Sequence, residues 1–207
     1  MPETNVRELE PTLRKAAAAL RDAEIPFMLG GSLAAWVRGG PPSRNDLDFM
    51  IRAEDSERAL EALEQVGMRR EKPPEEWLVK AWDGDVLVDL IHSAKGLPIT
   101  DEVLGRAEEM DVLAIPMLVM TLEDMLTTKL CVLDEHSLDL EPLLKITRAV
   151  REQVDWDQVR ARTAGSPFAR AYFTLVEELG IVPRSAAGAG GAGASRRSRV
   201  RVIGERA

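Results

Sequence analysis

A short apolar run that ends in two glycines and a serine constrains the fold of this chain more than any other segment. Residues 25–29 are apolar and end at Gly30-Gly31, and Ser32 begins a second apolar segment that continues through residues 33–37. This order predicts a buried strand, a tight turn and a helix. Glycine permits close approach of the backbone to a ligand, and N–H groups at a helix start attract anions. The turn therefore predicts either a phosphate-binding site or a strand-to-helix turn without a ligand.

Three aspartates on two predicted strands form the second feature. Asp46 and Asp48 alternate with apolar residues in 46–51, and two residues at i and i+2 of a strand share one face. Asp89 is the single carboxylate in the otherwise apolar segment 86–91. A buried charge is costly unless it is paired or metal-bound, and magnesium prefers carboxylate oxygens. The three residues therefore predict a site for two divalent cations; for the aspartate pair taken alone, the alternative is a solvated strand end.

These motifs together resemble those of the polymerase-β-like nucleotidyltransferase superfamily: Gly-Ser, a spacer, Asp-x-Asp, and a later acidic residue on a strand. Within it, the layout is similar to the minimal AbiEii/MenT-type nucleotidyltransferase toxins. The resemblance implies a nucleoside triphosphate substrate and two Mg²⁺ ions, with Mn²⁺ as a possible substitute. It implies catalytic and metal-binding roles for Asp46, Asp48 and Asp89, and contacts with the triphosphate for Gly30, Gly31 and Ser32.

Three further residues are candidates for nucleotide binding. The resemblance matches Lys129 and Asp139, in the second half of the chain, to a lysine and an aspartate of the toxins. Lys129 lies among apolar helix positions and could instead extend its charge past them to solvent, and Asp139 could instead stabilise a helix N-terminus. Arg44, just before the aspartate pair, holds phosphate or simply solvates its loop.

The acceptor of the nucleotide is open at this stage. The toxin resemblance implies the 3′ end of a transfer RNA, with a cognate antitoxin protein as a partner. An antibiotic acceptor, an aminoglycoside or a lincosamide, is the alternative, because acidic pockets suit cationic drugs and the chain is acidic. A catalytically dead nucleotide-binding module is the third interpretation, against which the retention of all three aspartates argues.

The rest of the pattern predicts an α+β fold, in which a small mixed sheet flanked by helices is followed by a C-terminal helical region. Asp83-Gly84 predicts a hairpin between strands 77–82 and 86–91, and Pro116 predicts that a strand over 112–117 lies at a sheet edge. Thr121 is expected to cap a helix that runs to residue 133. A further helix is expected over about 138–153, and others from about residues 156 and 167. The expected units are an α/β core over 1–120, a helical subdomain over 121–183 and a disordered tail, Gly/Ala-rich and then basic, over 184–207.

Composition narrows the class of protein. The formal net charge of −8 argues against general binding of nucleic-acid backbones. No run of 18 apolar residues is present, so no membrane span is expected, and the acidic N-terminus does not resemble a secretion signal. The single cysteine, Cys131, excludes an internal disulfide framework. A cytoplasmic protein is expected.

Overall fold

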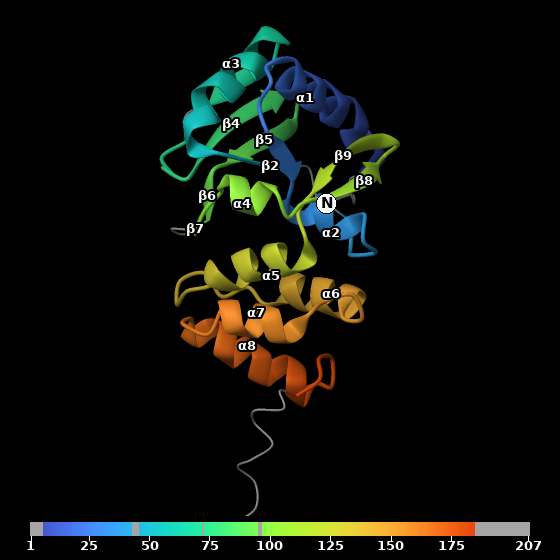
Figure 1. The fold of residues 1–207 in the computed structure, drawn as a ribbon, viewed down its shortest axis with the longest axis vertical. Coiled ribbons are helices and arrows are strands. Elements are labelled where there is room, and N and C mark those ends of the chain that lie inside the picture. Colours follow the sequence, from blue (N-terminus) through green and yellow to red (C-terminus); the bar gives the residue numbers. More distant parts are fainter. Residues whose placement is uncertain (1–5, 43–45, 72, 95–96, 185–207) are drawn as a thin grey trace, which may run out of the picture.

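A mixed seven-stranded sheet lies between two groups of helices in the computed structural model of this chain, which describes residues 6–42, 46–71, 73–94 and 97–184 (Figure 1). This arrangement, with a helical region at the C-terminal end, confirms the predicted α+β class. The strands are β1 (Phe27–Leu29), β2 (Asp46–Ile51), β3 (Arg69–Glu71), β4 (Leu78–Asp83), β5 (Val86–Ile91), β6 (Ser93–Ala94), β7 (Leu97–Pro98), β8 (Glu108–Val112) and β9 (Ile115–Val119). The helices are α1 (Glu10–Asp22), α2 (Gly31–Trp36), α3 (Ser56–Gln65), α4 (Asp101–Leu104), α5 (Leu122–Cys131), α6 (Glu141–Val150), α7 (Trp156–Arg162) and α8 (Pro167–Glu178), with 3-10 turns η1 (Val6–Leu9) and η2 (Ala53–Asp55).

The strand order places the predicted aspartate strands side by side. The sheet runs β3-β4-β5-β2-β1-β9-β8, and β6 and β7 form a separate two-stranded ribbon. The pairs β2–β5 and β1–β9 are parallel, whereas the other neighbours in the large sheet are antiparallel. Because β2 and β5 are parallel partners, their residues meet at equal depth in the sheet.

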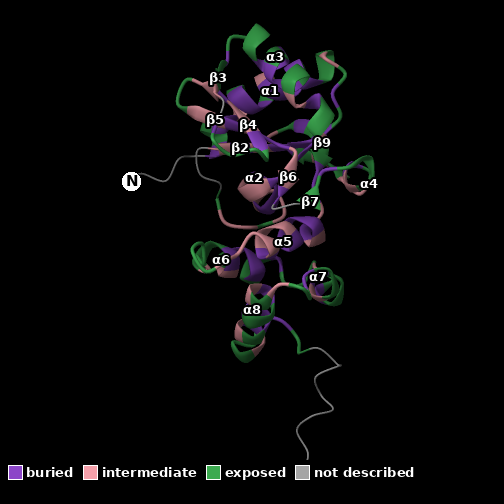
Figure 2. Ribbon diagram, turned by 90° about the vertical axis from the view of Figure 1, so that its left-hand side faces the viewer, coloured by how far each residue is buried: buried purple, intermediate pink, exposed green. Residues whose placement is uncertain are grey.

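The two faces of the sheet are covered differently. Helices α1 and α3 pack on one face and form a single apolar cluster with alternate strand residues such as Phe49 and Leu90. On the opposite face, residues such as Met50 and Ile91 pack with the helices of the C-terminal region. The buried segments in Figure 2 follow these two clusters, one above the sheet and one below it. Asp46 and Asp48 alternate with Leu47 and Phe49 and therefore belong to the second face.

A buried carboxylate ties the helical region to the segment that follows α4. Asp124, in the first turn of α5, is 3% exposed. Arg106 donates two hydrogen bonds of 3.0 Å to its carboxylate, and Arg162 at the end of α7 donates a third. The predicted cap is confirmed, because the Thr121 hydroxyl accepts the backbone N–H of Asp124 at 3.2 Å. Three segments distant in the sequence thus share one anion.

The strand predicted over 112–117 is wrong. The structure has a hairpin there instead, in which β8 and β9 are joined by Leu113 and Ala114 with φ of 51° and 60°. The edge strand is β8, and β9 lies between β8 and β1. Pro116 is accommodated because β9 pairs with β1 only at its last residue, Val119, so the proline side of β9 has no ladder partner in β1.

The helix expected over 138–153 is shorter in the structure, where α6 spans Glu141–Val150. The hairpin at Asp83-Gly84 is confirmed, with Gly84 at a φ of 61°. Most of the tail predicted over 184–207 lies outside the described residues. Among the residues that are described, no helix has the length and apolar character needed to cross a membrane.

Candidate active site

Backbone register brings the three predicted aspartates together. Asp48 and Asp89 are direct partners in the parallel ladder between β2 and β5, and Asp46 lies two residues before Asp48. Partners in a ladder project from the same face, so all three carboxylates lie on the face that the C-terminal helices only partly cover. The structure therefore gathers them from two strands whose pairing no local pattern reveals.

The glycine turn packs directly against this carboxylate group. The N–H of Gly30 donates to the carbonyl of Asp48 at 2.8 Å, and Gly31 follows with a φ of 60°. A Cβ at position 31 would overlap the Asp48 carboxylate, so only glycine fits here. The backbone N–H of Ser32 donates to the same carboxylate. The predicted phosphate-binding turn and the predicted metal-binding strand thus form one site.

The electrostatics of the site are those of a crowded anionic group. Burial, and then the charges of Asp46 and Asp89, raise the pKa of Asp48 from 3.8 to about 7. Burial also raises the pKa of Asp89 to about 6, against the opposing charge of Lys80. The Oδ1 atom of Asp89 is buried and has no hydrogen-bond partner. Buried polar atoms are normally satisfied, so an unpaired carboxylate oxygen among like charges indicates a place for a cation.

Lys129 approaches the site from the helical region. It lies in α5, and its charge lowers the pKa of Asp48 against the larger effects of burial and of the other two carboxylates. Lys129 is therefore close enough to Asp48 for its charge to act on this carboxylate, and its role toward the triphosphate stays a prediction.

Two other predicted residues are not placed with this group. Arg44 lies outside the described residues, so its role in holding phosphate stays a prediction. Asp139 is exposed just before α6, where its carboxylate accepts the N–H of Glu141 at 3.2 Å. That contact matches the helix-terminus alternative, and the role of Asp139 in nucleotide binding stays a prediction.

The carboxylates fit magnesium in an incomplete coordination sphere. Within the described residues, no three side chains of His, Cys, Asp or Glu converge as a ready-made metal cage. Magnesium is usually bound by one or two carboxylates together with substrate phosphates and waters. The unpaired Oδ1 of Asp89 and the proximity of Asp48 suit this kind of site, which the phosphates of a bound substrate would complete.

Sequence reasoning missed the residues that surround Asp89 on its other side. Lys80 is the antiparallel partner of Asp89 in β4, and Glu71 is the partner of Lys80 in β3. Glu75, in the loop before β4, adds a further negative charge near Asp89. The hairpin at Asp83-Gly84 carried the signal for Lys80, because counting back from that turn pairs positions 80 and 89. Nothing in the sequence indicated β3, which consists of Arg69, Arg70 and Glu71.

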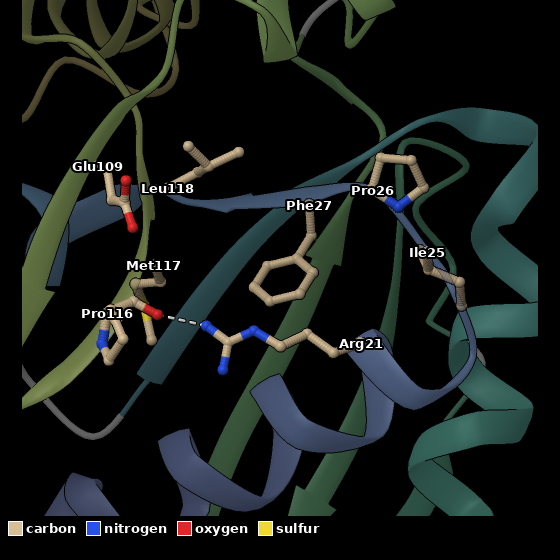
Figure 3. Close-up of a pocket in the computed structure, with 8 residues that line it drawn as sticks. All are labelled: Arg21, Ile25, Pro26, Phe27, Glu109, Pro116, Met117 and Leu118. Carbon is tan, nitrogen blue, oxygen red and sulfur yellow. Dashed lines mark hydrogen bonds between the residues drawn. The ribbon is translucent and has the colours of Figure 1, made fainter.

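A separate pocket lies at the opposite end of β1 from Gly30. Its volume is about 440 Å³, and its lining residues are Arg21, Ile25, Pro26, Phe27, Glu109, Pro116, Met117 and Leu118 (Figure 3). Arg21 lies 5.9 Å from the centre of the Phe27 ring and donates to the carbonyl of Pro116. None of the predicted site residues lines this pocket, so the carboxylate site is a separate, polar surface.

Comparison with known proteins identifies the class of enzyme. The model of a family described as an uncharacterised nucleotidyltransferase matches residues 5–177. The chain belongs to this nucleotidyltransferase family, and the predicted enzyme class is confirmed. The finer resemblance to the AbiEii/MenT toxins stays a prediction. A search of curated proteins found no match.

Solved nucleotidyltransferase structures share the fold. The antibiotic-resistance factor ANT(2″)-Ia in solution is 17% identical with a TM-score of 0.57, over 81% of this chain and 94% of that one. The crystal structure of ANT(2″)-Ia with adenylyl-2″-tobramycin is 17% identical with a TM-score of 0.57, over 78% of this chain and 97% of that one. A putative nucleotidyltransferase from H. pylori is 16% identical with a TM-score of 0.51, over 89% and 85%. At these identities the similarity establishes the fold alone.

Proposed function

We propose that this protein transfers a nucleoside monophosphate from a nucleoside triphosphate to the hydroxyl group of an acceptor, with divalent cations held by Asp46, Asp48 and Asp89. The observation that carries the proposal is the ladder pairing of Asp48 with Asp89 beside the glycine turn. Bound divalent cations would polarise the α-phosphate and lower the pKa of the acceptor hydroxyl. Without cations, the same carboxylates repel one another, and the pKa of Asp48 is raised first by burial and then by the charges of Asp46 and Asp89.

The glycine turn and α5 are proposed to bind the donor, the nucleoside triphosphate. The backbone at Gly31 and the side chain of Ser32 are proposed to contact the β- and γ-phosphates. Lys129 is proposed to offset the charge that builds on the leaving pyrophosphate, because a fixed cation next to developing charge stabilises the transition state. Arg44 and Asp139 stay predictions for the same triphosphate.

Asp89 is the proposed proton acceptor. The acceptor oxygen forms a bond to the α-phosphorus, the bond to pyrophosphate breaks, and the hydroxyl proton passes to the Asp89 carboxylate. The buried Oδ1 of Asp89 has no hydrogen-bond partner, so it is available to accept this proton.

Two versions of this function differ in the molecule that accepts the nucleotide. The toxin resemblance favours the 3′ end of a transfer RNA, with an antitoxin partner, Mg²⁺ as cofactor and a cytoplasmic location. The alternative is an antibiotic acceptor, and ANT(2″)-Ia, which shares this fold, has been solved in complex with the adenylylated aminoglycoside adenylyl-2″-tobramycin.

The test uses purified protein, each α-labelled nucleoside triphosphate in turn, MgCl₂, and either total transfer RNA or tobramycin. Label is expected on one acceptor, and EDTA or Asp48→Asn is expected to abolish the transfer. Asp111→Asn, an exposed aspartate in β8, is the matched control and is expected to transfer normally. Full transfer by Asp48→Asn would overturn the proposed site. Binding of nucleotide by the wild type without transfer to either acceptor would favour the dead-module interpretation.

A further inference from the structure

Two rows of side chains extend from the aspartates across the sheet to its edge. In the first row, ladder partners run from Asp48 to Asp89, Lys80 and Glu71. In the second row, they run from Asp46 to Leu87, Trp82 and Arg69; these eight side chains share one face. The surface of β5, β4 and β3 beside the carboxylates therefore carries an aromatic ring, an aliphatic side chain and charges of both signs.

This surface is open only at the end of the strands away from the helical region. At the helical end of β2, β5 and β4, the residues Met50, Ile91 and Leu78 are 4%, 9% and 4% exposed. Two and four residues further along each strand on the same face, every side chain is partly exposed, including Leu87 and Trp82. On all three neighbouring strands, the exposure of the side chains increases with distance from the helical region. These strands therefore define an open shelf next to the aspartates, and not a solvated position on a single strand.

One hydrogen bond and one guanidinium contact orient Trp82 on this shelf. Its indole Nε1 donates to Oε2 of Glu71 at 2.7 Å, and the guanidinium carbon of Arg69 lies 5.7 Å from the ring centre. A ring that is oriented in advance loses less entropy when a ligand packs on it, so a partly exposed tryptophan with these contacts is a good contact surface for a substrate.

The charge of the shelf selects among substrates. Besides the three aspartates of the site, Glu71 and Glu75 act electrostatically on Asp89, and the cations on the two rows are Lys80 and Arg69, so the carboxylates outnumber the cations. Two Mg²⁺ ions and a triphosphate with four negative charges would cancel one another and leave this excess of carboxylates. Such a surface repels a polyanion and attracts a cation, because like charges in a partly enclosed site are costly.

We propose that the shelf formed by Trp82, Leu87, Lys80 and Glu71 binds the acceptor, and that the acceptor is a small, amine-bearing polyhydroxyl compound and not a nucleic acid. The proposal rests on the nucleotidyl transfer proposed above and names its substrate class. An in-line reaction at the α-phosphate needs acceptor and leaving group on opposite sides. The glycine turn lies over β1 and β2 on one side of the aspartates, and the shelf lies over β5, β4 and β3 on the other. Trp82 packs on the carbon skeleton of the acceptor, and Glu71 and Glu75 face its amines.

The test measures tobramycin binding in the presence of MgCl₂ and a non-hydrolysable nucleoside triphosphate. Trp82→Ala is expected to weaken tobramycin binding at least tenfold and to leave binding of the nucleotide analogue unchanged. Trp82→Phe is expected to restore most of the affinity. Trp77→Ala is the matched control, since Trp77 is 41% exposed just before β4 and its position in the strand alternation places it off this face. Glu75→Gln is expected to weaken tobramycin binding and to reduce its dependence on salt.

The outcomes separate this inference from the function on which it rests. Equal tobramycin binding by Trp82→Ala and Trp77→Ala, or no tobramycin binding by the wild type, overturns the shelf as an amine-bearing acceptor site. Label on transfer RNA together with absent tobramycin binding assigns an RNA acceptor, overturns the inference and leaves nucleotidyl transfer intact. Failure of the wild type to bind the magnesium–nucleotide complex at all overturns the proposed function itself.

Discussion

Replacing Asp48 by asparagine is expected to stabilise the metal-free fold while it abolishes nucleotide transfer. The folded protein raises the pKa of this carboxyl from 3.8 to about 7, chiefly through burial and then through Asp46 and Asp89. The folded state therefore binds the proton more tightly than the unfolded chain does. Stability is lost as the pH rises from about 4 to about 7, and the full penalty is present above that range.

The size of the effect follows from the shift. A shift of about 3 units at about 1.36 kcal/mol per unit gives a penalty of about 4 kcal/mol at pH 8. At pH 5 the same calculation gives a smaller penalty to folding, of about 1.6 kcal/mol. Asparagine keeps an oxygen that can accept the Ser32 N–H but carries no charge. Because the three carboxylates titrate together, the expected gain at pH 8 is about 2–4 kcal/mol.

Urea unfolding followed by circular dichroism, in EDTA at pH 8 and pH 5, measures the prediction. Asp48→Asn is expected to be more stable than the wild type at pH 8, with a smaller gain at pH 5. MgCl₂ is expected to stabilise the wild type and to have little effect on the variant. The control Asp111→Asn should match the wild type at both pH values. An Asp48→Asn protein that is less stable at pH 8, or a gain that does not shrink at pH 5, refutes this account of the site.

Three further variants test single contacts. Gly31→Ala is expected to lower the free energy of unfolding in urea by about 1–3 kcal/mol and labelled transfer more than tenfold. The control is Gly67→Ala, which has a φ of 85° but open space around it and should show only backbone strain and normal transfer. Equal losses in the two variants would contradict the overlap with Asp48. Lys129→Met is expected to lower kcat/KM for the triphosphate about a hundredfold, and an unchanged value would remove Lys129 from the site. Asp124→Ala is expected to cost about 3–5 kcal/mol, because it leaves Arg106 and Arg162 without their shared anion; a loss under about 1 kcal/mol in urea unfolding would show that the ion group is not structural.

Local signals in the sequence were enough for the elements that carry them. The strand before Gly30, the hairpin at Asp83-Gly84 and the cap at Thr121 are all present. The β8–β9 hairpin was not predicted because its turn places Leu113 and Ala114 at positive φ, where glycine, asparagine or aspartate is expected. This hairpin is stabilised by five cross-strand pairs, and no residue in its turn predicts it from the sequence.

The site was predictable in part for the same reason. Spacing alone put Asp46 and Asp48 on one face, but their approach to Asp89 depends on the parallel pairing of β2 with β5, which are separated in the chain by α3, β3 and β4. The shelf around Trp82 depends on β3, a polar edge strand without an alternating pattern. Long-range pairing is decided by the packing of the whole sheet. Residue types alone could therefore indicate a functional role for Asp89, but they could not predict that Trp82 lies near it.

The contact between Gly31 and Asp48 also constrains how related sequences can diverge. A side chain at position 31 and a carboxylate at position 48 exclude one another, since both would occupy the same space. A lineage that keeps the carboxylate can keep only glycine at position 31, whereas a lineage that loses it is free to drift there. Homologues with a larger residue at position 31 are therefore expected to lack the acid at position 48, so substitution at one position marks descendants in which the proposed cation site has been lost.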